Sequence, residues 1–411
     1  MTTRKRPNLP TRDKCCGCAA CYDACPHSAI TMTEDKNGFL YPNVDEDICV
    51  GCGLCVAKCH IANLKLIQRH KIGQPLKAWT TDQELIKNSA SGGVFAQLAT
   101  DFLSVGGAVV GAKLEGKCDV RHVVIKSVSE LQSLQNSKYR QSIASGIYAE
   151  AQQLLRKGVD VLFSGTPCMV AALQHFLGNR DKYEGKLLTI EIICHGVPSS
   201  ELIKQALHYH NADSVVRFRT KSMGWLMGNR VVYEKNGKTE ERKDRCEDYF
   251  FRMYLSMSFL RNNCYECPYA NIERVADITI GDFWEKTYGK IDNHDGVSVV
   301  SVNSKVGMKY IMQSKMLHTE PVEWRACLPA NINLYMPTNN NLVRLGKYIH
   351  ILKKLPQCIR INAFLCGFRS RLLYKYQMKF VWLITPKLLA KKIVKQQQKL
   401  HEVLRMAKEK D

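Results

Sequence analysis

Hydrophobic and polar positions divide the chain into three stretches with different patterns. Residues 1–65 are turn-rich and contain only short apolar runs. Residues 75–330 alternate short apolar runs with segments whose apolar positions recur at helical spacing, which indicates strands and helices in alternation. Residues 331–411 place apolar positions at helical spacing among basic side chains. The pattern predicts an α+β protein with a small N-terminal domain, an α/β body and a basic helical C-terminal extension.

The strands and helices of the body can be located more closely. Apolar runs predict strands at residues 106–114, 121–128, 159–165 and 186–193. Helices are predicted to begin at Ser129 and to follow the last two strands over residues 166–177 and 194–210. Pro167 and Pro198 suit the first turns of those two helices. Residues 229–243 predict a hairpin, because Asn236-Gly237 is a favoured two-residue turn.

Composition separates the same three stretches by chemistry. A length of 411 residues predicts two or three domains. Nine of the 18 cysteines lie between Cys15 and Cys59. The first residues show no apolar signal segment and no run reaches transmembrane length, so we expect a cytoplasmic protein whose dense cysteines serve metal or redox chemistry. The net charge of +21 lies mostly in the tail, where residues 331–411 hold 17 Lys and Arg against three acidic residues.

The cysteines of the head form two runs that begin at Cys15 and Cys49, and both follow C-x2-C-x2-C-x3-C. Three thiolates from one tight loop suit a cubane cluster, and the fourth cysteine of each run ligates the other cluster in two-cluster ferredoxins. The predicted ligand sets are Cys15, Cys18, Cys21 and Cys59 for one [4Fe-4S] cluster and Cys49, Cys52, Cys55 and Cys25 for the other. Between the runs, residues 28–45 predict a hairpin around Asn37-Gly38.

Zinc is the alternative interpretation of the head. Structural zinc sites use paired C-x2-C knuckles and leave no role for the third cysteine of each run, so the spacing favours iron–sulfur clusters. Two residues depart from the pattern. His60 stands where a proline usually follows the last cysteine, and Cys16 belongs to neither ligand set. We interpret His60 as a change in the turn and Cys16 as a spectator thiol.

Four further cysteines in the body point to a second metal site. Cys168 and Cys194 each follow a predicted buried strand, and the carboxyl ends of parallel strands share one crevice. Cys264 and Cys267 form a C-x2-C pair farther along the chain. These four cysteines can hold a third [4Fe-4S] cluster. Alternatively, Cys168 and Cys194 are ordinary buried cysteines and the pair binds nothing, and the spacing leaves both interpretations open.

Several weaker signals in the body suit an anionic ligand. Residues 89–99, SASGGVFAQLA, place small residues and two glycines before a helix whose N-terminus can hold an anion. Lys138-Tyr139 is a candidate contact for a flavin or substrate, and the default interpretation of the pair is an exposed lysine beside a packed tyrosine. Asp277 and Asp282 flank a short predicted strand and can orient a cofactor or cap turns.

The body resembles the coenzyme F420 hydrogenase/dehydrogenase beta-subunit family, in the form with an N-terminal two-cluster ferredoxin. The matching stretches occur in family order between residues 75 and 290, and they are SASGGVF, NSKYRQS, SGTPCMVAAL, ICHGVPS, VRFRTKSMGW, NCYECPYA and ADITIGDFW. Two positions depart from the family pattern. Glu285 stands where a glycine is expected, and Met169 stands where glutamine is frequent.

The resemblance implies an oxidoreductase that contains FAD and iron–sulfur clusters and passes electrons to a small organic acceptor or a deazaflavin coenzyme. Residues implied near the flavin are Ser91, Gly92, Gly93, Lys138, Tyr139, Thr166 and Pro167, with Lys138 and Tyr139 as the candidate catalytic residues. The resemblance also assigns the third cluster to Cys168, Cys194, Cys264 and Cys267. Clusters carry single electrons and a flavin accepts one or two, so such a chain converts single-electron flow into hydride-equivalent transfer.

Partners and alternatives complete the sequence-based expectations. A redox partner protein or ferredoxin is expected to exchange electrons with the head. In the tail, one helical face with lysines around it contains Leu389, Ile393, Leu400 and Leu404. Such a helix can lie on the anionic inner face of a membrane, dock on an acidic partner or pack on the protein's own body. No nucleic-acid module is present in the sequence. The alternative functions are a non-catalytic electron-transfer subunit and a metal-stabilised adaptor.

Overall fold

The computed structural model describes residues 7–225, 230–242, 248–255, 257, 259–284 and 295–338. The head and the body belong to one compact unit, Met1–Thr338. The predictions for Glu285 and for the amphipathic face of the tail lie outside the described residues. None of the described helices has the length and apolar character that crossing a bilayer requires.

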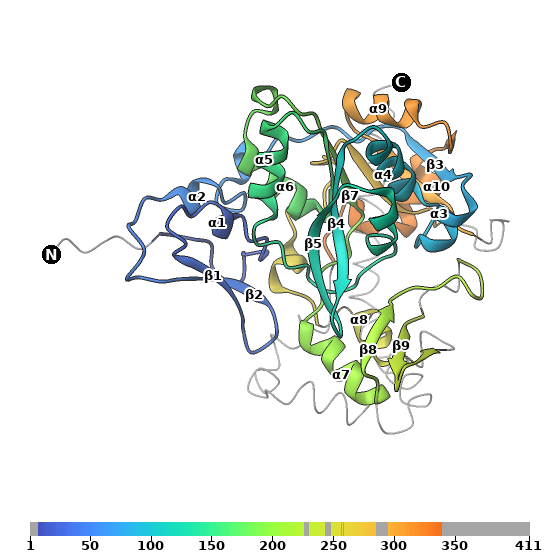
Figure 1. Ribbon diagram of the computed structural model, residues 1–411, viewed down its shortest axis with the longest axis horizontal. Helices are drawn as coiled ribbons and strands as arrows, with labels where there is room; N and C mark the ends of the chain where they lie inside the picture. Colours follow the sequence, from blue (N-terminus) through green and yellow to red (C-terminus); the bar gives the residue numbers. More distant parts are fainter. Residues whose placement is uncertain are drawn as a thin grey trace, which may run out of the picture. The chain divides into compact units, whose positions relative to one another are not determined.

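The head is built from one hairpin and two short helices (Figure 1). Its elements are α1 (Ala20–Asp23), β1 (Ile30–Glu34), β2 (Leu40–Val44), α2 (Leu54–Ala57) and the 3-10 turn η1 (Leu64–Leu66). The hairpin predicted around Asn37-Gly38 is confirmed, because β1 pairs with β2 in antiparallel register from Ile30 opposite Val44. Gly38 adopts φ +74 in the turn, and a Cβ there would lie 2.2 Å from Ser200 Oγ of the body.

The body is organised around an eight-stranded mixed sheet with the order β13-β3-β12-β11-β7-β6-β4-β5. The strands are β3 (Pro75–Thr80), β4 (Ala108–Glu115), β5 (Asp119–Ile125), β6 (Val161–Gly165), β7 (Leu187–Ile192), β11 (Ile278–Asp282), β12 (Ser298–Val302) and β13 (Leu317–Pro321). Strands β4, β6, β7 and β11 run parallel at its centre, and antiparallel strands flank them on both sides. The carboxyl ends of β6 and β7 therefore lie side by side, directly before Cys168 and Cys194.

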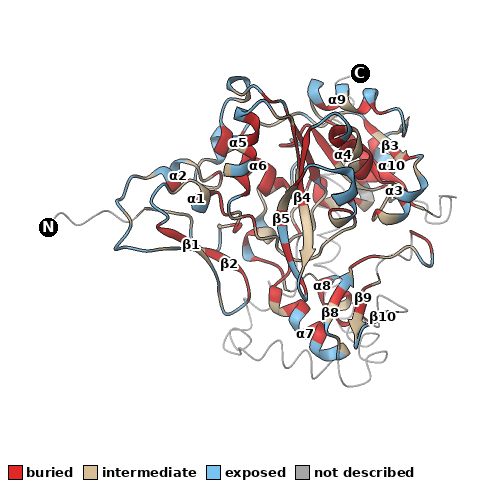
Figure 2. Ribbon diagram, viewed as in Figure 1, coloured by how far each residue is buried: buried red, intermediate tan, exposed pale blue. Residues whose placement is uncertain are grey.

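Helices cover both faces of this sheet (Figures 1 and 2). The helices of the body are α3 (Gln83–Asn88), α4 (Val94–Ser104), α5 (Ile147–Arg156), α6 (Pro167–Leu177), α7 (Ser200–His210), α8 (Tyr249–Leu255), α9 (Lys305–Gln313) and α10 (Trp324–Cys327). Strand β6 alternates between the faces, since Val161 and Phe163 pack with α5, α6 and the head whereas Leu162 packs with α4. This period of two gives the body a core on each side of the sheet.

Short 3-10 segments and a separate three-stranded sheet complete the body. The segments are η2 (Val128–Ser133), η3 (Arg180–Lys182), η5 (Asn262–Glu266), η6 (Leu328–Ala330) and η7 (Ile332–Leu334). The small sheet has the order β10-β9-β8, with β8 (Ser214–Arg217), β9 (Val232–Lys235) and β10 (Lys238–Glu241). The predicted hairpin at Asn236-Gly237 is confirmed by the antiparallel pairing of β9 with β10.

Two local predictions were wrong. The segment after β5 is the 3-10 turn η2, and its cap is Ser127, whose side chain accepts a hydrogen bond from the backbone N–H of Ser129. Pro198 does not begin a helix, because it forms an isolated bridge with Leu260 and α7 starts later, after its cap Ser199. Pro167, in contrast, occupies the first turn of α6 as predicted.

Candidate iron–sulfur and flavin site

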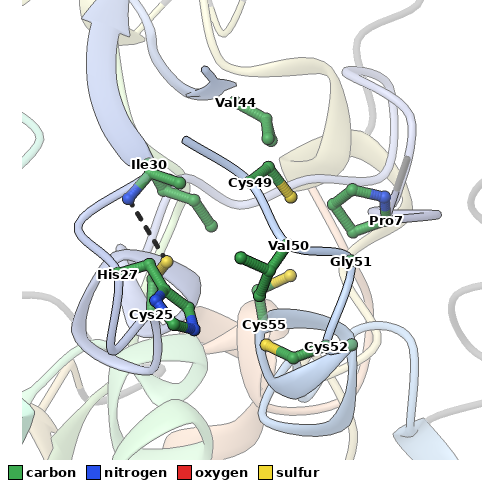
Figure 3. A pocket seen from close by; sticks show the side chains of 12 residues that line it. Pro7, Cys25, His27, Ile30, Val44, Cys49, Val50, Gly51, Cys52 and Cys55 are labelled. Atoms are coloured by element: carbon green, nitrogen blue, oxygen red, sulfur yellow. Dashed lines mark hydrogen bonds between the residues drawn. The ribbon is translucent and has the colours of Figure 1, made fainter. Parts of the chain in front are cut away.

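Eight cysteines of the head line two separate cavities. The outer cavity is lined by Cys25, Cys49, Cys52 and Cys55, whose side chains surround a common space in Figure 3. The inner cavity is lined by Cys15, Cys18, Cys21 and Cys59, and Cys16 lines it as a fifth cysteine. Each set takes three cysteines from one run and the fourth from the other, which is the crosswise grouping that the spacing predicts. The assignment of each cysteine to a cluster stays a prediction.

Tight left-handed turns bring each set of thiols together. Gly17 and Gly51, each inside a cysteine run, adopt φ +67 and φ +72, a conformation that glycine enters without strain. The loops also direct backbone N–H groups at sulfur. Gly17 donates to Cys15 Sγ at 3.4 Å, and Ala29 donates to Cys25 Sγ at 3.3 Å. Such hydrogen bonds to sulfur are among the factors that set cluster potentials.

The four body cysteines meet in a third cavity. Cys168 lies in the first turn of α6, Cys194 lies in the loop after β7, and Cys264 and Cys267 lie in and after η5. Backbone N–H groups again point at sulfur, since Gly196 donates to Cys194 and Val197 donates to Cys264, each at 3.4 Å. The structure thus brings together four thiols that are separated by up to 99 residues in the sequence.

Burial governs the protonation of these thiols. It raises the pKa of Cys264 to about 12 and that of Cys267 to about 11. For Cys168 a side-chain hydrogen bond with Cys16, followed by burial, raises the pKa well above its ordinary value. Metal ligation requires thiolates, so a metal centre in this cavity must displace these protons.

Two buried arginines place positive charge beside the body cavity. Arg261 is fully buried and Arg274 is 2% exposed, and both line the cavity. Arg274 donates through Nε to the buried carboxylate of Glu191 on β7 and through Nη1 to the carbonyl oxygens of Tyr269 and Asn271. Arg274 therefore fixes the loop that follows the Cys264–Cys267 pair and supplies charge that complements an anionic centre.

The sequence analysis gave no role to Cys16 and His60, and the structure places both at the junction of head and body. Nε2 of His60 lies 3.2 Å from Cys16 Sγ, and Nδ1 hydrogen-bonds with the hydroxyl of Tyr269. The ligand atoms of Cys16, Cys18 and His60 lie within 4.8 Å of one another. The sequence did single these two residues out, because both depart from the two-cluster cysteine pattern.

The residues predicted near the flavin fall into two groups. Thr166 and Pro167 begin α6 beside the body cavity, and Thr166 Oγ1 lies 3.1 Å from Cys168 Sγ. The predicted residues Ser91, Gly92 and Gly93 lie before α4. There Ser91 Oγ donates to the carbonyl of Val297 at 2.8 Å, and a Cβ on Gly92 would lie 2.4 Å from the carbonyl oxygen of Ala78.

Two lysines of this region donate to backbone carbonyls, and one of these carbonyls belongs to the Ser91–Gly93 loop. Lys221 donates to the carbonyl of Ser91 at 2.8 Å. Lys138 donates to the carbonyls of Leu134 and Gln135, and burial followed by the nearby charge of Arg217 lowers its pKa to about 7.

The second predicted substrate-side residue, Tyr139, packs against aromatic side chains. Its ring centroid lies 5.2 Å from that of Phe251, and burial raises its pKa. Arg219 donates through Nη1 to Asp282 at 2.9 Å. Asp277, at the other end of β11, is bound instead by Arg180 and Thr189, so its carboxylate is part of the core of the sheet.

Comparisons with known proteins agree with this architecture. Residues 159–324 match the model of the C terminus of the coenzyme F420 hydrogenase/dehydrogenase beta subunit, and residues 14–63 match the 4Fe-4S dicluster domain. The chain therefore carries a C-terminal domain of the coenzyme F420 hydrogenase/dehydrogenase beta-subunit family together with an N-terminal 4Fe-4S dicluster domain. The resemblance stated from the sequence is therefore confirmed.

Some relatives align with the head alone, and others align with most of the chain. An uncharacterized ferredoxin of Methanocaldococcus jannaschii is 42% identical over 48 residues, 12% of this chain and 61% of that protein, so the chain spans less than two thirds of it. The F subunit of the F(420)H(2) dehydrogenase of Methanosarcina mazei is 22% identical over 315 residues, 72% of this chain and 81% of that protein. A chain of the F420-reducing [NiFe] hydrogenase complex from Methanosarcina barkeri aligns with a TM-score of 0.45 and 17% identity over 64% of this chain and 88% of that chain.

Proposed function

We propose that the protein is an iron–sulfur flavoprotein oxidoreductase that passes electrons between ferredoxin-type [4Fe-4S] clusters, FAD and a small organic acceptor or a deazaflavin coenzyme. The observation that carries the proposal is the convergence of four cysteines from three segments in one cavity beside the head. Relatives in the family are hydrogenase and dehydrogenase subunits whose names refer to coenzyme F420. These names support the reaction class and leave the acceptor open.

The body cavity fits a third [4Fe-4S] cluster by its donor set. Four thiols are the usual ligand number for a cubane, and they are the predicted residues Cys168, Cys194, Cys264 and Cys267. Backbone N–H groups at 3.4 Å from two of the sulfurs would stabilise the negative charge of a bound cluster. The arginines that line the cavity contribute in the same direction.

The surroundings of Lys138 fit the anionic and polar parts of FAD. Lys221 supplies positive charge at the Ser91–Gly93 loop, where the pyrophosphate would bind, and Lys138 supplies an amine that donates to the carbonyls of Leu134 and Gln135. Oδ1 of Asn136 is buried and has no hydrogen-bond partner among the described residues, so it offers an acceptor to a polar edge of the cofactor. FAD, when bound, exchanges one or two electrons and thereby links single-electron centres to a hydride-equivalent substrate.

The two sets of head thiols differ in their exposure, so one set would face a partner protein and the other faces the body. Cys52 of the outer set is exposed, and a redox partner protein or ferredoxin would approach there. The inner loop faces the body, because Tyr148 donates to the carbonyl of Cys18 at 2.9 Å and Gln141 donates to that of Gly17 at 3.0 Å. The chain would thus hold its centres in the order outer head, inner head and body.

Anaerobic purification with iron counting and flavin extraction tests the proposal. We expect about twelve irons per chain, four for each cubane, together with bound FAD. Cys264→Ser is expected to lower the count to about eight, whereas Cys327→Ser, a buried cysteine of α10 away from the cavities, should leave it at about twelve. About eight irons without flavin in the wild-type protein would contradict the proposal and favour an electron carrier or adaptor.

A further inference from the structure

Asp282, at the end of β11, belongs to the same edge of the sheet as the thiols of the body cavity. Strands β7 and β11 run parallel with Ile192 opposite Ile280. Cys194 and Asp282 each stand two residues farther along, so they follow at neighbouring strand ends. In an open sheet this edge is where ligands bind, and here it joins the proposed body cluster to a polar group that the metal chemistry does not use.

The carboxylate of Asp282 is engaged at both oxygens and fixes a buried arginine. Oδ2 accepts a hydrogen bond from Nη1 of Arg219 at 2.9 Å, and Oδ1 accepts one from the indole N–H of Trp225 at 3.3 Å. The Arg219 side chain is only 4% exposed. Asp282 is therefore a positioning residue that holds one corner of the guanidinium in place.

Arg219 keeps donors that the protein does not use. Its Nε and Nη2 atoms are buried and have no hydrogen-bond partner among the described residues. The side chain of Asn136 donates to the backbone carbonyl of Arg219 at 3.1 Å, and its own Oδ1 is buried without a partner as well. Buried polar groups are nearly always paired, so these two side chains in one place indicate a ligand that accepts at Arg219 and donates at Asn136.

A flavin ring complements this set of donors and acceptors. The pyrimidine edge of the ring carries acceptors at N1 and the C2 carbonyl, and a donor at N3–H. Because Asp282 neutralises Arg219, the pair suits a neutral ring carbonyl better than a phosphate. Lys221, two residues after Arg219, donates to the carbonyl of Ser91 in the loop proposed for the pyrophosphate, so one segment serves both parts of the cofactor.

We propose that Arg219 binds the N1–C2 carbonyl edge of the flavin ring and stabilises the negative charge that reduction places there. This role rests on the proposed flavin. Two electrons, supplied singly by the iron–sulfur centres, and one proton from water, which bonds to N5, convert the neutral oxidised ring into an anion. Arg219 keeps its protons, and none of its covalent bonds forms or breaks. Its hydrogen bonds strengthen as the acceptor gains charge, so Arg219 raises the reduction potential of the flavin.

Redox titration of FAD bound to the anaerobically purified full chain tests this role. We expect Arg219→Met to lower the equilibrium constant of the two-electron reduction about tenfold, which is a shift of about 30 mV to lower potential. Arg219→Lys keeps the charge and should restore part of the shift. Arg180→Met is the matched control, because Arg180 donates to Asp277 at 3.0 Å in an ion pair at the opposite end of β11, and it should leave the potential unchanged.

A double variant keeps the test valid if the single one is unstable. Arg219→Met leaves the carboxylate of Asp282 without its cation, whereas Arg219→Met combined with Asp282→Asn leaves no unpaired charge. The double variant should bind oxidised FAD and still show an equilibrium constant about tenfold lower than that of the wild type. By linkage, its affinity for reduced FAD should fall about ten times further than its affinity for oxidised FAD, and titration with FAD in each state measures both.

The outcomes separate this role from the proposed function. A flavin potential in the double variant equal to that of the wild type would overturn the role of Arg219 and leave the flavin function standing. Equal losses of affinity for oxidised and reduced FAD would make Arg219 a structural residue and would also overturn the role. Wild-type protein that contains no FAD, as purified or after incubation with FAD, would overturn the proposed flavin function, and the role of Arg219 with it.

Discussion

Asp23, the last residue of α1 in the head, caps helix α5 of the body, because its Oδ2 accepts a hydrogen bond from the backbone N–H of Tyr148 at 2.9 Å. Its Oδ1 accepts from the N–H of Gly146 at 2.6 Å. An N-cap side chain normally belongs to the residue that precedes the helix, and here that residue is Gly146, which has none. Docking of the head therefore supplies a cap that the body sequence lacks.

Asp23→Ala should weaken the contact between head and body. Losing an N-cap costs about 1–2 kcal/mol, so we expect the free energy of unfolding to fall by this amount. Asp23→Asn is the graded comparison, because its one side-chain oxygen can still accept from the N–H groups of Tyr148 and Ala149 while its amide nitrogen cannot accept from Gly146, so we expect a smaller loss than in Asp23→Ala. Urea denaturation of the anaerobically purified proteins measures the difference. Equal losses in both variants would show that the carboxylate charge matters and the cap does not.

Arg261 is a second body residue that holds the head. Its guanidinium donates to the carbonyls of Cys15 at 3.2 Å and Leu40 at 2.9 Å, and it lies 4.5 Å from the ring centroid of Tyr41. A third hydrogen bond, at 2.6 Å, reaches Gln141 Oε1 in the body. One fully buried cation therefore joins a cluster loop, the head hairpin and the body, and it also lines the body cavity.

Arg261→Met should destabilise the protein strongly. Each hydrogen bond from a charged donor contributes on the order of 1.5–3 kcal/mol, and the carbonyls would be left buried without a partner, so we expect a loss of at least about 3 kcal/mol. The measurement is again urea denaturation. Arg325→Met is the control, because the Arg325 side chain is 76% exposed in a surface ion pair, and such pairs contribute little. A loss for Arg261→Met no larger than that control would contradict the bridging role.

Glu191 and Arg274 form a buried ion pair beneath the body cavity, with side-chain exposures of 0% and 2%. Glu191→Ala leaves a buried guanidinium without its counter-charge, and breaking one side of such a pair costs about 3–5 kcal/mol. We therefore expect a large loss of stability, measured by thermal or urea denaturation. Glu320→Ala removes an exposed carboxylate and should change stability little. A small effect of Glu191→Ala would mean that the loop after Cys267 relaxes enough to hydrate Arg274.

The fold of the head was predictable because the residues that determine it lie close together in the sequence. Eight cysteines at fixed spacing, with Asn37-Gly38 between the runs, determine both loops and the hairpin within about sixty residues. The strand-to-helix connection at Pro167 was predictable for the same reason, since proline suits the first turn of a helix. Pro198 failed because its backbone pairs with Leu260, which is distant in sequence.

The contacts between head and body could not be predicted from the sequence. The roles of Asp23 and Arg261 depend on partners more than a hundred residues away, and neither periodicity nor spacing in the sequence indicates such contacts. The convergence of Cys168 and Cys194 with Cys264 and Cys267 was left open for the same reason. It required the parallel order β6-β7-β11, which places two strand ends beside the η5 segment.

Lys138 should make stability depend on pH. Burial lowers its pKa to about 7, whereas an unfolded lysine titrates near 10.4, so between these values the unfolded chain binds a proton that the folded chain does not. Stability from this group therefore rises with pH across that window and is lost as pH falls toward 7. Lys138→Met removes this titrating group. The melting temperature of the wild type should therefore rise relative to that of the variant from pH 7 to pH 10. Lys157→Met, at an exposed helix end, is the control, and a difference for Lys138→Met that stays constant with pH would show that the amine remains charged when folded.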